Sequence, residues 1–121
     1  MLARVTDVKE TPFYTFVGGD TGFDHLARIS MYGAYYAIVN ATRVHGRKAV
    51  VCIVGNLCES GDVFAGDRSA SACQEGDLLA ISVAGAYGFC MSTNHNSRPR
   101  PAEVLVKAGQ ARVIRDREEI A

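Results

Sequence analysis

The placement of glycine constrains the fold of this chain more than any other feature. Glycines recur along the whole sequence and separate apolar runs of four to eight residues. Runs of this length bounded by glycine are typical of β-strands joined by turns, whereas helices need about ten residues or more. The spacing therefore predicts a mainly β domain. We expect an antiparallel β-barrel or a strongly bent sheet, because short strands of this kind close on themselves.

The individual strands are predicted from apolar or alternating runs with turn residues at their ends. The segment 48–54 is apolar on both faces, so we expect it at the centre of the sheet with Cys52 in the core. A pair of runs joined by a turn at Ala108-Gly109 predicts a closing hairpin. The strands expected in chain order are residues 2–8, 13–17, 48–54, 77–83, 87–91, 103–107 and 110–114.

One main helix is expected, from about residue 24 to residue 39. Asp24 is a suitable N-cap, since its carboxylate can accept hydrogen bonds from the free amides of the first turn. Apolar and tyrosine side chains occupy most positions around this helix, which predicts that it is buried or packs against a partner. Arg28 and Tyr32 are four residues apart and would share a face.

Length and charge restrict the class of function. A chain of 121 residues makes one domain. Its 13 basic and 13 acidic residues cancel, which argues against a nucleic acid or an anionic membrane as the main partner. There is no apolar run long enough to cross a membrane and no apolar signal region at the start. The four cysteines form no C-x-x-C pair, so we expect free thiols in a reducing cytoplasm.

The loop Gly55-Asn56-Leu57-Cys58-Glu59-Ser60-Gly61-Asp62 carries the most distinctive chemistry of the chain. Cys58 and Glu59 are either a core cysteine beside a surface carboxylate, or a thiol that donates a proton beside a carboxylate that binds an ammonium group. A free cysteine is usually buried and inert. Cys58, however, lies in a polar, glycine-flanked loop where a thiol gains little from burial, and this favours the functional interpretation.

Two further patterns allow a structural and a functional interpretation. Arg28 beside Tyr32 is either a surface arginine whose stem covers a ring or a clamp for a carboxylate. Tyr87, within Gly85-Ala86-Tyr87-Gly88, is either a ring packed in a turn or a phenol that reaches a phosphate or a carboxylate. The three histidines are scattered, and each is interpreted as solvated or hydrogen-bonded within the fold.

Several segments, in their order along the chain, resemble the C-terminal domain of the pyridoxal-phosphate (PLP) dependent decarboxylases of the alanine-racemase type, and diaminopimelate decarboxylase in particular. The resemblance covers nearly the whole chain. It rests on Asp20-Thr21-Gly22-Phe23 with Arg28 and Met31-Tyr32-Gly33-Ala34-Tyr35, on Cys58-Glu59-Ser60-Gly61-Asp62, on Gly76-Asp77-Leu78-Leu79, on Gly85-Ala86-Tyr87-Gly88-Phe89, and on residues 94–106.

The resemblance implies a role for each matching residue. Cys58 matches the cysteine that supplies a proton to the substrate carbon after carbon dioxide leaves. Glu59 matches the residue that holds the distal ammonium of the substrate, and Arg28 and Tyr32 match those that bind its distal carboxylate. Tyr87 matches a tyrosine that contacts both the cofactor and the substrate. The implied substrate is meso-diaminopimelate, and the implied product is lysine.

The main departure from the family is that no part of the sequence resembles the family's N-terminal domain. The family's PLP-binding lysine lies in an N-terminal (β/α)8 barrel, and nothing in this chain matches that barrel. We therefore expect residues 1–121 to be a detached C-terminal domain or one subunit of a split enzyme, inactive alone. Its expected partners are a PLP-binding barrel domain or subunit, and a second copy in a homodimer or larger assembly. Smaller departures are Ile29 in place of proline and His95 in place of tyrosine.

Two other functions remain open at the level of sequence. One is a non-catalytic β domain that serves as an interaction or regulatory module; against this, a module has no need to keep all five matching residues together. The same fold also serves ornithine and arginine decarboxylases, but Glu59 and Arg28 speak against those substrates.

Overall fold

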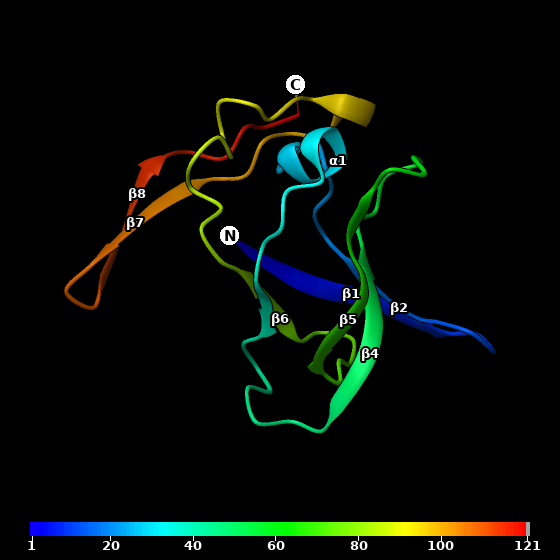
Figure 1. Ribbon diagram of the computed structural model, residues 1–121. Coiled ribbons are helices and arrows are strands. Elements are labelled where there is room, and N and C mark those ends of the chain that lie inside the picture. Colours follow the sequence, from blue (N-terminus) through cyan, green and yellow to red (C-terminus); the bar gives the residue numbers. More distant parts are fainter. Residues whose placement is uncertain (121) are drawn as a thin grey trace.

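The computed structural model describes residues 1–120 and consists mostly of strands (Figure 1). The elements in chain order are β1 (Leu2–Glu10), β2 (Thr15–Gly19), α1 (Arg28–Tyr32), β3 (Ile38–Asn40), β4 (Lys48–Val54), β5 (Val63–Ser71), β6 (Leu78–Ile81), the 3-10 turn η1 (His95–Ser97), β7 (Glu103–Lys107) and β8 (Gln110–Arg115).

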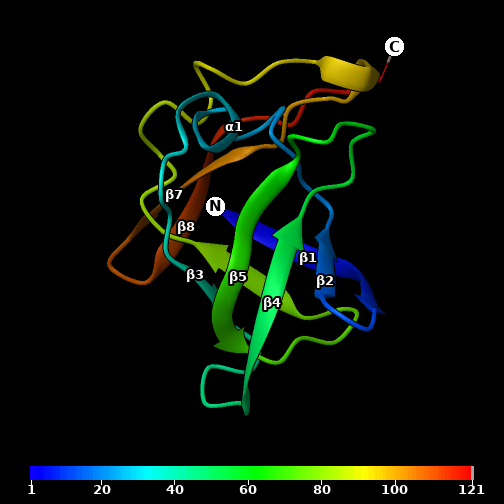
Figure 2. The same ribbon diagram turned by 45° about the vertical axis from the view of Figure 1, so that its right-hand side comes forward.

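Six of the strands form one strongly bent sheet that nearly closes into a barrel (Figure 2). The strand order is β3-β6-β1-β2-β4-β5. Its two edges approach each other: Arg68 of β5 donates a hydrogen bond from Nη1 to the carbonyl of Tyr36, just before β3, at 2.9 Å. Asn40 at the end of β3 donates one to the carbonyl of Ala72, just after β5, at 3.3 Å. The expected mainly β, barrel-like fold is therefore confirmed.

One strand pairing differs from the expected antiparallel pattern. β2 and β4 run parallel, with Phe16 opposite Cys52 and Gly18 opposite Val54, while the other pairings of the sheet are antiparallel. Parallel neighbours need a long crossover connection, and the segment from β2 to β4 supplies it through α1 and β3. The C-terminal ends of β2 and β4 consequently lie side by side, so the loops that follow them begin at the same end of the barrel.

The core fills the inside of the bent sheet. β4 lies between β2 and β5, and its bounds are those expected from the sequence. In the first half of β1, Ala3 and Val5 point inward at the two-residue period of a strand, until the irregularity between Val5 and Asp7 breaks it. Cys52 is buried, as expected. The residues of the main cluster are Val5, Val17, Leu26, Tyr36, Ile38, Val51, Ile53, Phe64, Ala65, Ala70, Leu79, Ile81 and Ala84.

The prediction of a helix over residues 24–39 is wrong in its extent. The helix α1 covers only Arg28–Tyr32 and begins after Ala27, which makes no side-chain cap. It ends because Gly33 adopts a left-handed conformation, with φ 62° and ψ 27°. The N–H of Gly33 donates hydrogen bonds to the carbonyls of Arg28 and Ile29. A glycine in this conformation is a common helix terminator. The chain is then extended until it enters β3, so Arg28 and Tyr32 are the two ends of a single helical turn.

Two other differences concern strands. The segment 87–91, expected as a strand, forms turns, with Tyr87 at φ 64° and the N–H of Met91 bonded to the carbonyl of Tyr87 at 3.3 Å. A Cβ at Gly88 would overlap the carbonyl of Ala84, so this turn is tight enough to need glycine. The strands β3 and β5 were not expected. β5 contains Gly66-Asp67, a dipeptide typical of turns, and Asp67 has a positive φ of 45°. A strand was therefore not predicted there.

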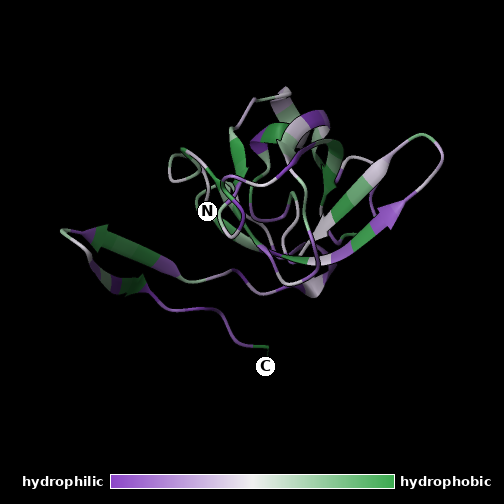
Figure 3. Ribbon diagram, turned by 90° about the horizontal axis from the view of Figure 1, so that it is seen from below, coloured by the Kyte–Doolittle hydropathy of each residue, from purple (hydrophilic) through white to green (hydrophobic). Residues whose placement is uncertain are grey.

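The expected closing hairpin, β7 and β8, is confirmed, but it forms a separate two-stranded sheet. Figures 1 and 3 show it extending away from the barrel, with apolar stretches along both strands. Within residues 1–120, no helix has the length and apolar character needed to cross a membrane.

Candidate active site

Three segments meet at one end of the barrel, at the top in Figure 1. The first, residues 20–32, follows β2 and includes α1, and the second, the loop 55–62, follows β4. The third contains η1. The first two begin side by side because β2 and β4 are parallel neighbours in register. The fold thereby brings together segments that carry Arg28, Cys58 and His95.

Asp62 organises the loop 55–62 from within. Its carboxylate accepts hydrogen bonds from the N–H of Leu57 at 2.8 Å and from the N–H of Phe23 at 2.8 Å, which ties the loop to the first segment. A Cβ at Gly55 would overlap this carboxylate, so a glycine is required there. Burial raises the pKa of Asp62, although the two N–H donors oppose that rise. Sequence reasoning gave Asp62 no role of its own.

Cys58 and Glu59 lie at the exposed tip of this loop. Cys58 is a free, exposed thiol, whereas Cys52 is buried. The Oε1 atom of Glu59 lies 3.2 Å from Nε2 of His95. The Oγ of Ser30 in α1 donates a hydrogen bond to the carbonyl of Gly61 at 2.8 Å, so the loop is also attached to the helix. The thiol is therefore accessible from outside the protein, and the carboxylate of the next residue is held by its contact with His95.

His95 links two of the three segments through its ring. The ring stands 5.1 Å from the ring of Phe23, centroid to centroid, at an interplanar angle of 49°. η1, which carries His95, contains Asn96 in a left-handed conformation with φ 56°. The sequence-based interpretation of His95 as solvated or satisfied is correct as to its hydrogen bond, but it did not identify Glu59 as the partner.

Arg28, the first residue of α1, lies close to Tyr87 in the turns that follow β6. The guanidinium carbon of Arg28 lies 5.0 Å from the centroid of the Tyr87 ring, a cation–π distance. Tyr87 has a positive φ, and its ring is exposed. Tyr32 is 64% exposed at the end of α1. Among residues 1–120, no hydrogen bond or aromatic contact joins Tyr32 to the other four predicted site residues.

A buried charge cluster lies beneath these segments. Asp24, expected as a helix N-cap, is instead fully buried, with Oδ2 lying 3.2 Å from Nε of Arg98 and 3.3 Å from Nε2 of His25. Burial lowers the pKa of His25, against the opposing influence of Asp24. In the neutral ring, Nε2 donates to the carbonyl of Pro99 at 3.3 Å and Nδ1 accepts from Thr21 Oγ1 at 3.0 Å. The cluster anchors the segment around Arg98 to the barrel.

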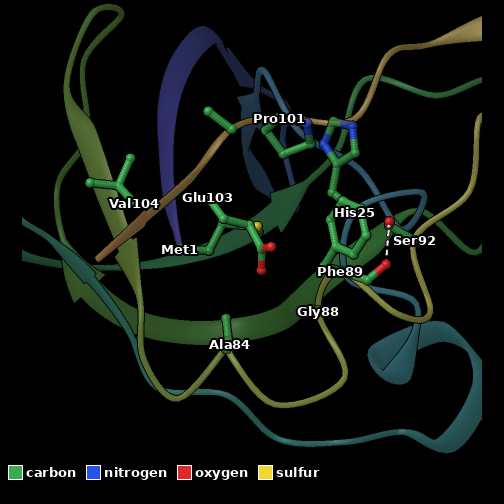
Figure 4. A pocket seen from close by; sticks show the side chains of 11 residues that line it. Met1, His25, Ala84, Gly88, Phe89, Ser92, Pro101, Glu103 and Val104 are labelled. Atoms are coloured by element: carbon green, nitrogen blue, oxygen red, sulfur yellow. Dashed lines mark hydrogen bonds between the residues drawn. The ribbon is translucent and has the colours of Figure 1, made fainter. Parts of the chain in front are cut away.

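A hollow of about 210 Å³ lies beside this cluster (Figure 4). Its walls come from Met1, the turns that follow β6, and the start of β7. His25 and Phe89 line it, but the five predicted site residues do not. The hollow is therefore distinct from the segments that carry Cys58 and Arg28. Within the described part of the chain, no group of three His, Cys, Asp or Glu side chains is placed to hold a metal ion.

The fold and the three segments define a class of protein: a β domain that presents an exposed thiol and side chains of both charges at one end of a nearly closed sheet. The chain belongs to the family described as pyridoxal-dependent decarboxylase, C-terminal sheet domain, whose family model matches residues 1–85.

Individual relatives agree with this family. The chain is 50% identical to diaminopimelate decarboxylase from Methanothermobacter thermautotrophicus over 119 residues, which are 98% of this chain and 28% of that protein. The crystal structure of diaminopimelate decarboxylase from M. jannaschii superimposes with a TM-score of 0.92 at 44% identity, over 98% of this chain and 27% of that one. Lysine/ornithine decarboxylase from Vibrio vulnificus, at 23% identity and a TM-score of 0.74, shares the fold.

Proposed function

We propose that residues 1–121 are the C-terminal domain of a PLP-dependent decarboxylase that converts meso-diaminopimelate to lysine and carbon dioxide in lysine biosynthesis. The observation that carries the proposal is the joining of the Cys58-Glu59 loop to the segment of Arg28 at one end of the barrel. The names of the relatives support it, and so does the structure of the M. jannaschii enzyme in complex with L-lysine.

The proposed roles follow from the chemistry of the side chains. The substrate carries a carboxylate and an ammonium group at the end remote from the reaction. The guanidinium of Arg28 can bind a carboxylate in bidentate fashion, with the phenol of Tyr32 beside it. Glu59 would hold the ammonium. Sγ of Cys58 would deliver a proton to the carbon that loses carbon dioxide, as a general acid. Cys58, Glu59 and Tyr32 are all exposed, as residues that meet an external ligand must be.

PLP is the cofactor of the family, and the residues present fit one side of a cofactor site. The exposed phenol of Tyr87 is a donor suited to the cofactor and the substrate. Lys9, Lys48 and Lys107 lie in β1, β4 and β7, outside the site segments, so the lysine that binds PLP would come from another domain. When bound, PLP accepts the electron pair that decarboxylation releases.

The proposed partners complete this site. They are an N-terminal PLP-binding barrel, either preceding this domain in one protein or as a separate subunit, and a second copy in a homodimer or larger assembly. The chain spans about 28% of the length of the curated relatives, which supports a missing domain. Free cysteines are typical of the cytoplasm, where we place the enzyme.

The test is reconstitution. The isolated chain with PLP and meso-diaminopimelate should release no carbon dioxide above the cofactor-only background. The assembled enzyme, in which this chain is joined to a PLP-binding barrel domain, should release carbon dioxide and lysine. Failure of the assembled enzyme with intact folding would favour a non-catalytic interaction module. Turnover of ornithine or arginine in preference to meso-diaminopimelate would assign it to the other branch of the fold.

Cys58 provides the sharpest variant, with Cys52 as its matched control. In the assembled enzyme, Cys58→Ala should lower kcat by about 10²- to 10⁴-fold with a smaller effect on KM, because proton delivery follows binding. Cys52→Ala should leave the kinetics unchanged and lower only the thermal midpoint, since Cys52 is a core residue. Equal kinetic effects of the two substitutions would contradict the role of Cys58.

A further inference from the structure

We infer that His95 is a positioning residue that fixes the carboxylate of Glu59 for recognition of the substrate's distal ammonium group. This inference rests on the proposed function and deepens it. It assigns a role to a side chain outside the five site residues, on a segment 36 positions away from Glu59 in sequence.

In the contact between His95 and Glu59, the histidine is the hydrogen-bond donor. A carboxylate can only accept a hydrogen bond, so Nε2 of His95 carries the proton in its 3.2 Å contact with Oε1 of Glu59. This contact occupies one oxygen of the carboxylate and leaves Oε2 for an ammonium ligand. Glu59 lies on an exposed loop and is itself about half exposed, so without His95 its side chain would sample several rotamers.

His95 can fix Glu59 because its own ring is fixed. The ring packs against Phe23 at 5.1 Å, and the backbone N–H of Phe23 is held by the buried carboxylate of Asp62 at 2.8 Å. The same carboxylate holds the N–H of Leu57, two residues before Glu59. Asp62 thus anchors both the loop that carries Glu59 and the ring that supports His95. The positions of Glu59 and His95 relative to each other therefore both depend on the buried carboxylate of Asp62.

The consequence for binding is entropic. An ammonium ligand that meets a carboxylate already held in one rotamer does not have to order that side chain. A hydrogen bond of this kind contributes about 1 kcal/mol, equivalent to about a fivefold change in affinity. Its loss should therefore appear in KM, whereas the chemical step at Cys58 should be little affected.

The experiment uses steady-state kinetics of the assembled enzyme with meso-diaminopimelate. His95→Phe keeps a ring against Phe23 and removes the donor, so it should raise KM about fivefold with little change in kcat. His95→Gln restores an N–H donor and should recover part of the loss. His45→Phe is the matched control, because His45 is an exposed histidine in the loop between β3 and β4, at the opposite end of the barrel in Figure 1. It should change neither constant.

A double-mutant cycle separates positioning from a general structural effect. Glu59→Gln alone should raise KM, and His95→Phe in that background should add nothing further, since His95 acts through the carboxylate. If Glu59→Gln raises KM while His95→Phe does not, or if the two effects add in full, the inference is wrong although the proposed function stands. If Glu59→Gln leaves KM unchanged, the proposed role of Glu59 fails, and the role of His95 fails with it.

Discussion

At the scale of single residues, Asp62 is the side chain on which the candidate site depends most. It is buried, and its carboxylate accepts hydrogen bonds from backbone N–H groups of two separate segments. Removing it leaves both donors unpaired inside the protein. Asp62→Ala should therefore destabilise the domain by about 1.5 to 3 kcal/mol, measured by urea unfolding. Asp7→Ala on the exposed side of β1 is the control and should change stability by no more than about 0.5 kcal/mol.

The acidic side chain of Glu118 gives a prediction about pH. Its carboxylate accepts hydrogen bonds from the backbone N–H and the guanidinium of Arg100 and from the amide of Asn94, and these lower the pKa of Glu118 to about 2. Because the folded-state pKa is depressed, this attachment of the C-terminal segment persists above the ordinary value of 4.5 and is lost as pH falls toward 2.

A carboxyl-detected NMR titration measures this pKa directly. Arg100→Gln should move the midpoint of Glu118 back toward 4.5, since it removes the guanidinium. Lys107→Gln, a loss of positive charge at the end of β7, should leave the midpoint where it is. A Glu118 midpoint near 4.5 in the unsubstituted chain would contradict the attachment.

At the scale of elements, the loop 55–62 contains two glycines with opposite requirements. A Cβ at Gly55 would overlap the Asp62 carboxylate, whereas a Cβ at Gly61 would meet no atom within 4 Å. Gly55→Ala should therefore lower the free energy of unfolding by about 1 to 3 kcal/mol, and Gly61→Ala should be nearly neutral. Thermal unfolding of the two variants side by side tests the claim. Equal losses in the two variants would contradict this difference between Gly55 and Gly61.

Elements with a uniform local pattern were predicted well. The strand at 48–54 and the hairpin at 103–107 and 110–114 have continuous or alternating apolar residues, and the structure has them at nearly the same bounds. The helix was predicted too long because the left-handed conformation of Gly33 depends on where the chain must go next, toward β3. β5 was missed because Gly66-Asp67 resembles a turn in sequence but lies within a long strand paired to β4.

For the candidate site, the sequence allowed the residues to be predicted, but it did not indicate which residues contact one another. The roles of Cys58, Glu59, Arg28, Tyr32 and Tyr87 follow from resemblance to a family, and they remain proposals. The structure added the contacts of Arg28 with Tyr87 and of Glu59 with His95. Such contacts join residues far apart in the chain, which local periodicity does not indicate.

At the scale of the whole molecule, the projecting hairpin should make the isolated domain associate. Val104, Leu105, Val106, Val113 and Ile114 are all exposed, and apolar residues gathered in this way are usually covered by another surface. Sedimentation of the purified chain should show association that increases with concentration. Val106→Asp with Ile114→Asp should shift the chain toward monomer, while His45→Phe should not. A strictly monomeric chain at high concentration would contradict this.

The long connection between β2 and β4 also offers a place at which the domain can be divided without splitting either group of proposed site residues. The crossover between them passes through the exposed segment 41–47 at the end of the barrel opposite α1. Cutting the backbone there would produce one fragment with Arg28 and Tyr32 and another with Cys58, Glu59 and Tyr87. Reassembly of the two fragments through the β2–β4 and β3–β6 ladders would then bring the five proposed site residues back into one domain, and that would make the domain a scaffold for a fragment-complementation reporter.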